Sequence, residues 1–318
     1  MSERKAILAT ENLTKTFPAS HGRTLTAVSE VSLSAYQGET LGIVGESGCG
    51  KSTYVKMLVH VIEPTSGTIT FDGRDITNLS GEALRQNHRE IQMVFQDPAA
   101  AFNPKMRIID IVTEPLTNYG LLKRSEKEDK CAELLEMVEL PKDFMYRYPH
   151  NMSGGQRQRI GVARALALSP KVIILDEATS ALDVSVQDRL VELLVRLQKE
   201  KDLTYLFICH DMALVHCMAH RVAVMYLGNV VEVLPSVEIA ENPLHPYTKA
   251  MLGSIFSHHM DFTKKIESIE GEVPSPLNVP EGCPFCDRCE HASDTCRKIK
   301  PGLTEATQGH LVACHLFG

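Results

Sequence analysis

A glycine-rich segment between a strand-like and a helix-like stretch constrains this chain more than any other feature. Residues 45–53 read GESGCGKST and fit the pattern G-x-x-x-x-G-K-S/T. The run ETLGIVG before it predicts a strand, and STYVKMLVHVI after it has helical apolar spacing that ends at Pro-Thr-Ser-Gly 64–67. In that setting the loop amides and Lys51 hold phosphates, and Ser52 binds Mg²⁺. The segment therefore predicts a nucleotide site, with a purely structural turn as the alternative.

The apolar run Val172–Asp176 predicts a second strand that ends in carboxylates. Its sequence, VIILD, lacks polar alternation, which is typical of a parallel strand covered on both faces. Asp176 is predicted to reach Mg²⁺ through water, and Glu177 to orient or deprotonate the attacking water. A buried strand with a solvated acidic end is the alternative for this motif taken alone.

Strand and helix signals alternate along most of the chain, which predicts an α/β fold with a mainly parallel core sheet. ILATENLTKTF and LTAVSEVSLSA predict an antiparallel β subdomain, and a helical insertion is expected at about 97–165. Near residue 240 proline and cysteine become frequent. We therefore predict a nucleotide-binding domain at 1–240 and a small cysteine-rich extension at 241–318.

The overall charge and hydropathy argue against two classes of protein, general nucleic-acid binders and membrane-spanning chains. The formal net charge of −7 provides no general basic field for a nucleic-acid backbone. No run approaches the roughly 18 consecutive apolar residues of a membrane span, and the start MSERKAILATENL lacks the apolar core of a secretory signal. The sequence predicts a cytoplasmic location and no nucleic-acid partner.

The segment NMSGGQ at 151–156, followed by RQRIGVARAL, resembles the signature motif of the ABC ATPases, usually written LSGGQ. Met152 stands where the family has leucine. In that family the motif starts a helix and grips the γ-phosphate of ATP held by the opposite subunit, and a serine and two glycines at a helix start suit an anion. An ordinary helix N-cap is the alternative for these residues alone.

The remaining family motifs follow in order, and their roles come from the resemblance. Gln96 in VFQDP matches the glutamine that contacts Mg²⁺ and relays the nucleotide state, Ser180-Ala-Leu-Asp183 resembles the D-loop, and His210 matches the histidine that contacts the γ-phosphate. Phe17 matches the aromatic that stacks on adenine. Glu177, His210 and Gln96 are then catalytic, Mg²⁺ is held by Ser52, Gln96 and Asp176, and the signature residues are Ser153, Gly154, Gly155 and Gln156. The ATP-binding set is Phe17, Gly45, Glu46, Ser47, Gly48, Cys49, Gly50, Lys51, Ser52, Thr53 and Asp176.

Five cysteines near the end of the chain predict a metal site. Their spacing is C-x2-C-x2-C-x6-C-x17-C, with His291, His310 and His315 nearby, and it suits either tetrahedral zinc or an iron–sulfur cluster. NPLHPYTKAML, GEVPSPLNVPEGC and these cysteines resemble the C-terminal extension of ATPase subunits from oligopeptide/dipeptide importers. That resemblance implies a 4Fe-4S cluster on Cys283, Cys289, Cys296 and Cys314, with Cys286 as a spare thiol or an alternative ligand.

The resemblance implies an ATPase subunit that powers peptide import through two separate membrane permease subunits. A paralogous ABC ATPase is the expected dimer partner, with a homodimer as the alternative, and an extracytoplasmic solute-binding protein takes part indirectly. The chain would act peripherally at the cytoplasmic face of the membrane. Relatives import oligosaccharides or nickel chelates as well as peptides, so the cargo stays open. An ATPase from another class, soluble and regulated by a metal cluster, is the rival function.

Overall fold

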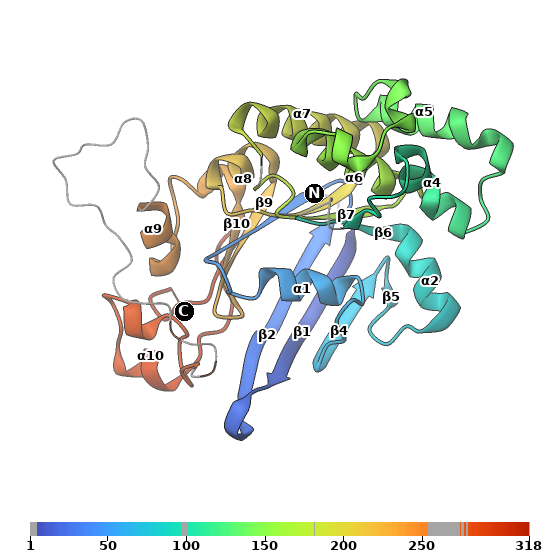
Figure 1. Ribbon diagram of the computed structural model, residues 1–318. Helices are drawn as coiled ribbons and strands as arrows, with labels where there is room; N and C mark the ends of the chain where they lie inside the picture. Colours follow the sequence, from blue (N-terminus) through green and yellow to red (C-terminus); the bar gives the residue numbers. More distant parts are fainter. Residues whose placement is uncertain are drawn as a thin grey trace.

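The computed structural model describes residues 5–96, 101–180, 182–253, 274, 277 and 279–317. They form two sheets with helices packed around them (Figure 1). The predicted start of the helical insertion, at 97–100, and part of the motif GEVPSPLNVPEGC lie outside the described residues. Within the described part of the chain, no helix has the length and apolar character needed to cross a membrane.

The larger sheet has the predicted parallel core. Its order is β11-β12-β10-β9-β3-β8-β7-β6, in which β9, β3, β8, β7 and β6 run parallel to one another and β10 is antiparallel to β9. β3, β7 and β8 are buried along their whole length, as their apolar runs indicate. The strands are β3 (Thr40–Val44), β6 (Ile91–Val94), β7 (Val172–Asp176), β8 (Thr204–Ile208), β9 (Arg221–Tyr226), β10 (Asn229–Pro235), β11 (Thr304–Thr307) and β12 (His310–Val312).

The two faces of this sheet belong to two hydrophobic cores. Successive side chains of a strand point to opposite faces, so Ile173 and Leu175 of β7 join the core formed with the helical insertion. Val172 and Ile174 join the core formed with α1 and the second sheet. That sheet has the order β2-β1-β4-β5 and is antiparallel. Its strands are β1 (Ala6–Pro18), β2 (Thr24–Tyr36), β4 (Ser66–Phe71) and β5 (Arg74–Asp75).

The helices agree with the sequence pattern in most places and depart from it in two. α1 ends at Leu58 and not near residue 62, because His60 takes a positive φ of 55° and the Val61 amide turns back to the Lys56 carbonyl at 2.9 Å. α2 was not expected, since its polar sequence buries only Asn87. The helices are α1 (Lys51–Leu58), α2 (Gly81–Glu90), α4 (Ile108–Asn118), α5 (Lys127–Met137), α6 (Gly154–Leu166), α7 (Val184–Lys201), α8 (Met212–Met218), α9 (Pro246–Gly253) and α10 (Asp294–Lys298).

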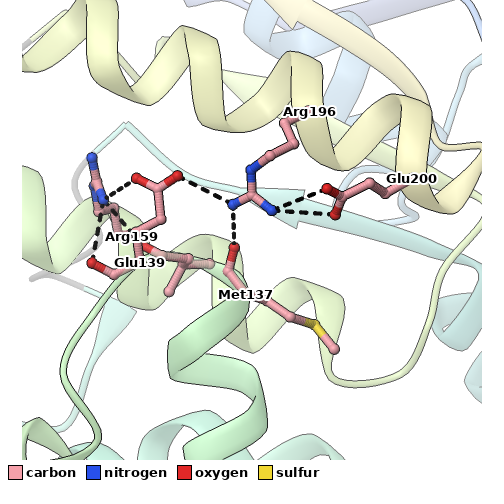
Figure 2. A network of polar contacts seen from close by, with 6 residues as sticks. Met137, Glu139, Arg159, Arg196 and Glu200 are labelled. Atoms are coloured by element: carbon pink, nitrogen blue, oxygen red, sulfur yellow. Dashed lines mark hydrogen bonds and ion pairs between the residues drawn. The ribbon is translucent and has the colours of Figure 1, made fainter.

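A polar network joins the helical insertion to the core domain (Figure 2). Glu139, just after α5, accepts from Arg159 of α6 at 3.1 Å and from Arg196 of α7 at 3.3 Å. Arg196 also donates to the Met137 carbonyl at 2.9 Å and pairs with Glu200 at 3.2 Å. One carboxylate therefore ties the helix that follows the signature motif to the helix that follows the D-loop.

The C-terminal extension continues the core sheet. β12 pairs with β10, with Val312 opposite Glu232. Glu232 is fully buried and accepts from the Leu244 amide at 2.6 Å, the His245 amide at 3.2 Å and His310 Nε2 at 2.7 Å. This single carboxylate connects β10, the loop before α9 and β12, so the extension has a buried polar anchor on the core sheet.

Candidate nucleotide-binding site

Four predicted site segments follow the carboxyl ends of four parallel strands. The glycine-rich loop follows β3, Gln96 comes shortly after β6, Glu177 follows β7 and His210 follows β8. Because parallel strands end at one edge of a sheet, the fold brings together segments that are more than 150 residues apart in sequence. This edge is the candidate site.

The backbone of the glycine-rich loop requires glycine at two positions. Gly45 has a φ of +146°, and a Cβ there would lie 2.1 Å from the Met225 carbonyl oxygen. Gly50, the N-cap of α1, has a φ of +105°, and a Cβ there would lie 2.2 Å from the Ala27 carbonyl oxygen. The loop is therefore wedged between β9 and β2 and presents the start of α1, where an anion is favoured.

Lys51 and Ser52 of this loop make polar contacts at the edge of the sheet. Lys51 is buried and donates to the carbonyl oxygens of Gly45 at 2.7 Å and Glu46 at 3.0 Å. Ser52 Oγ donates to Asp176 Oδ1 at 3.1 Å. Burial raises the pKa of the Asp176 carboxyl, while the Ser52 hydrogen bond opposes that shift. A hydroxyl and a carboxylate side by side are a suitable pair for Mg²⁺, directly or through water.

Glu177 and His210 form the second contact at this edge. Glu177 has a positive φ of 49°, and its side chain pairs with His210 Nε2. The Glu177 amide donates to the Ile208 carbonyl at 3.1 Å, which fixes the turn against β8. The left-handed backbone of Glu177 aims its carboxylate at a histidine, directly after Asp176 in the sequence. This arrangement suits the positioning of a water molecule.

Two other predicted residues lie apart from these contacts. Gln96 is exposed beyond the end of β6, where it can reach a bound ligand or another chain. Phe17 lies on β1 opposite Leu25 of β2, is half-buried, and has Lys15 Nζ 5.1 Å from its ring centroid. Neither residue makes a hydrogen bond or ion pair to the glycine-rich loop among the described residues.

The signature residues begin α6. Ser153 is the N-cap, its Oγ accepts from the Gln156 amide at 3.3 Å, and the Gln156 side chain accepts from the Ser153 amide at 3.0 Å. Ser153 and Gly154 are exposed, whereas Met152 is buried where the family has leucine. Within the described part of the chain, no hydrogen bond or ion pair joins this helix start to the glycine-rich loop. The start of α6 is thus stabilised by the reciprocal hydrogen bonds of Ser153 and Gln156, a capping box, and it is exposed where an anion could approach it.

The D-loop segment lies between Glu177 and α7. Ser180 Oγ donates to the Glu177 carbonyl at 3.0 Å, and Asp183 is the exposed N-cap of α7. Asp183 makes no side-chain cap bond, although its carbonyl accepts from the Val186 amide at 2.8 Å. The Asp183 carboxylate is thus at the surface of the site edge.

Residues of the C-terminal extension reach the glycine-rich loop, which sequence reasoning missed. The Glu46 amide donates to Tyr247 Oη at 2.9 Å, and Arg288 pairs with the Glu46 carboxylate at 3.0 Å. No local pattern marks these residues, since both contacts join positions about 200 or more apart. Arg288 stands between two of the clustered cysteines, and that position is the one available hint in the sequence.

The five clustered cysteines line one pocket together with three histidines. They are Cys283, Cys286, Cys289, Cys296 and Cys314, with His245, His291 and His315. Burial raises the pKa of Cys283 to about 12, so a thiolate there needs a cation beside it. In the described segments no three His, Cys, Asp or Glu side chains meet as closely as the ligands of a single metal ion do.

Two histidines near the cysteines behave differently from each other. His310, which the sequence groups with the cysteines, instead pairs with the buried Glu232. His245 is buried in the cysteine pocket, and its Nδ1 accepts from the Tyr247 amide at 3.1 Å. Its Nε2 is buried without a hydrogen-bond partner among the described residues.

Two regions of the chain match known family models, and the whole chain is similar to known proteins. A model described as "ABC transporter" matches residues 28–180, and one described as "Oligopeptide/dipeptide transporter, C-terminal region" matches residues 231–296. The chain is 47% identical to the oligopeptide transport ATP-binding protein AppF of Bacillus subtilis, with 99% of each chain covered. It is 44% identical to OppF of Salmonella typhimurium, with 99% of this chain and 97% of OppF covered.

The fold is also similar to solved ATP-binding cassettes. A dimeric post-hydrolysis structure of the cassette MJ0796, bound to ADP and phosphate, has a TM-score of 0.66 and 30% identity, covering 72% of this chain and 98% of that one. CbiO1 of Clostridium perfringens, part of an ABC transporter complex, has a TM-score of 0.66 and 29% identity, covering 74% and 90%. The likeness to these cassettes covers about three quarters of this chain, whereas AppF matches it over its whole length.

Proposed function

The chain belongs to the ATP-binding subunits of ABC transporters of the oligopeptide/dipeptide family and is an ABC-type ATPase, and from this we propose that it powers the import of di- or oligopeptides. The cargo proposal rests on the full-length likeness to AppF and OppF, whose names specify oligopeptide transport. Oligosaccharides and nickel chelates remain as alternative cargoes in the experiment below.

The contacts at the carboxyl edge of the core sheet carry the catalytic part of the proposal. Lys51 and the loop amides hold the phosphates, and Ser52, Asp176 and Gln96 hold Mg²⁺. Glu177 orients or deprotonates the attacking water, and its partner His210 contacts the γ-phosphate. Mg²⁺ neutralises charge on the phosphates when bound. Phe17 stacks on the adenine.

We further propose that two ATPase subunits enclose ATP between them. The exposed start of α6, which makes no contact with the glycine-rich loop of its own chain among the described residues, supplies Ser153 to Gln156 to the ATP of the partner. Asp183 faces the same interface. The partner is a paralogous ATPase, and residues 1–240 form the ATPase domain. Gln96 and the helical insertion contact two permease subunits at the cytoplasmic face of the membrane, which makes the chain a peripheral component.

The test is peptide uptake in cells that lack this chain but keep its transporter partners. Wild-type protein should restore uptake of a labelled oligopeptide, whereas Lys51→Ala should not, because the phosphates lose their buried cation. Labelled oligosaccharide and nickel chelate serve as competing cargoes. Restoration of either of these without peptide uptake would refute the peptide assignment. Failure to co-purify with membrane permeases would refute the transporter role and favour a soluble ATPase.

We also propose that Cys283, Cys289, Cys296 and Cys314 hold a 4Fe-4S cluster, with zinc as the alternative. The gathering of all five cysteines around one pocket supports this proposal. When bound, the cluster cross-links the segment 283–314, which has few other buried side chains. Anaerobic purification should yield absorption near roughly 400 nm with matched iron and sulfide. Stoichiometric zinc without iron would show that the site holds zinc and no iron–sulfur cluster. Absence of both metals would refute the proposal.

A further inference from the structure

Arg288 of the cysteine segment binds the glycine-rich loop through an ion pair that joins residues 242 positions apart. Its guanidinium donates to the two carboxylate oxygens of Glu46 at 3.0 and 3.3 Å and to Tyr226 Oη at 3.3 Å. The Arg288 side chain is only 6% exposed and that of Glu46 25%. A two-pronged contact with this degree of burial is well shielded from solvent and salt.

Every polar group of Glu46 has a partner. Its amide donates to Tyr247 Oη at 2.9 Å, its carbonyl accepts from Lys51 at 3.0 Å, and its carboxylate binds Arg288. Tyr247 and Arg288 come from the C-terminal extension, and Lys51 comes from the loop itself. The entrance of the phosphate loop is thus held from outside the ATPase domain as well as from within.

An aromatic cluster supports this contact from behind. Tyr226 of β9 lies 4.6 Å from Tyr247 and 5.2 Å from Phe285 between ring centroids, and Phe285 lies 5.5 Å from Tyr247. Tyr226, Tyr247 and Phe285 are each buried. Phe285 lies between Cys283 and Cys286, so the segment that carries the cysteines is packed directly against the residues that hold Glu46.

The charge of Glu46 conflicts with the ligand of this loop. ATP brings several negative charges to the amides around residues 48–52, and an unpaired carboxylate two residues away would repel them. Arg288 cancels that charge. We propose that Arg288 is a positioning residue of the ATP site: it neutralises and orients Glu46, so that nucleotide affinity depends on the C-terminal extension. The proposal rests on the ATP site and is independent of the cargo.

The experiment measures the dissociation constant for ATP with Mg²⁺ on the purified full chain. Arg288→Met should raise this dissociation constant roughly ten-fold, because it leaves the Glu46 carboxylate near the phosphates without its partner. A ten-fold change corresponds to about 1.4 kcal/mol of binding free energy. The increase should shrink at high salt, since salt screens the exposed carboxylate. Arg288→Lys, which keeps the charge, should stay within about three-fold of wild type.

A double variant separates positioning from mere stability. In the Glu46→Gln background no carboxylate remains beside the phosphates, so adding Arg288→Met should raise the dissociation constant for ATP by much less than it does in the wild-type chain. Arg297→Met is the matched control, because Arg297 lies in the same segment and its pair with Asp287 is exposed, at 59% and 55%. It should leave the dissociation constant unchanged.

Three results would overturn the proposal: Arg288→Met with wild-type affinity, Arg288→Lys as weak as Arg288→Met, or the same loss from Arg288→Met in both backgrounds. If Arg288→Met does not fold, two other comparisons of the dissociation constant for ATP test the proposal. One compares Arg288→Lys with wild type, and the other compares the double variant with Glu46→Gln. Wild-type protein that does not bind ATP would instead refute the proposed function, whereas loss of peptide uptake with normal ATP binding leaves this proposal intact.

Discussion

Replacement of Gly155 by alanine tests how the signature helix packs on the helix after the D-loop. A Cβ at Gly155 would lie 2.4 Å from Val186 Cγ1, and ordinary contacts begin near 3.4 Å. Val186 lies in the first turn of α7, and its branched side chain has one stiff torsion. The added methyl must therefore rotate Val186 out of its preferred rotamer or push α6 away from α7.

The expected energies have opposite signs. Overpacking of this kind costs about 1–3 kcal/mol, whereas alanine favours the helix over glycine by about 1 kcal/mol. Gly155→Ala should therefore range from neutral to about 2 kcal/mol destabilising in the wild-type chain. In a Val186→Ala background the clash disappears, and the same substitution should stabilise by about 1 kcal/mol. The coupling between the two sites is then about 1–3 kcal/mol.

The assay is thermal unfolding of the four proteins without nucleotide. For a chain of this size 1 kcal/mol corresponds to about 2 °C in Tm, so the coupling should amount to about 2–6 °C. ATPase activity should fall in Gly155→Ala and recover in part with Val186→Ala, because the position of the signature motif recovers. An effect of Gly155→Ala on Tm that is the same in both backgrounds would refute the packing argument.

Three further predictions concern the acidic residues. Glu177→Gln should abolish ATP hydrolysis while leaving ATP binding intact, because the water loses its carboxylate partner; measured turnover near the wild-type rate would exclude Glu177 from catalysis. Asp176→Asn should raise Tm of the nucleotide-free protein at pH 7.5, since burial raises the pKa of Asp176 and the ionised carboxylate is then disfavoured in the folded state. This gain should fade as the pH falls through the raised pKa and be lost below about 4, where the carboxyl becomes protonated in the unfolded state as well. A gain independent of pH would contradict the burial argument. Glu232→Ala should lower the free energy of unfolding by about 3–5 kcal/mol, because it leaves His310 and two amides without their acceptor. The control Glu238→Ala, at a side chain that is 37% exposed, should lower it by at most about 1 kcal/mol. Equal losses for the two variants in denaturant titrations would show that Glu232 is no special anchor.

The cysteine segment shows how far sequence patterns reached beyond the ATPase core. The spacing predicted that five cysteines gather, and all five line one pocket. It did not distinguish the roles of the neighbouring histidines. His310 binds Glu232 across two strands, whereas His245, from the loop before α9, lines the pocket. Which imidazole faces a pocket depends on strand pairing, and Cys-His spacing contains no information about it.

Local features of the sequence determined the ATPase core because they fix local backbone conformation. A loop that needs positive φ at Gly45 and Gly50, and apolar runs that predict buried parallel strands, are readable from a few neighbouring residues. Once parallel strands form, their carboxyl ends meet at one edge, so the grouping of Lys51, Asp176 and Glu177 followed from the pattern alone.

Only the tertiary structure decided which distant side chains meet. The Arg288–Glu46 pair joins residues 242 positions apart, and the Glu232–His310 pair joins residues 78 positions apart. The close approach of Gly155 to Val186 joins residues about 30 positions apart, on either side of the D-loop. Each depends on the angle at which separate elements pack, and many residues scattered along the chain set that angle together. Short motifs therefore specify the ATP site, whereas the packing of the whole chain specifies how the C-terminal extension holds it.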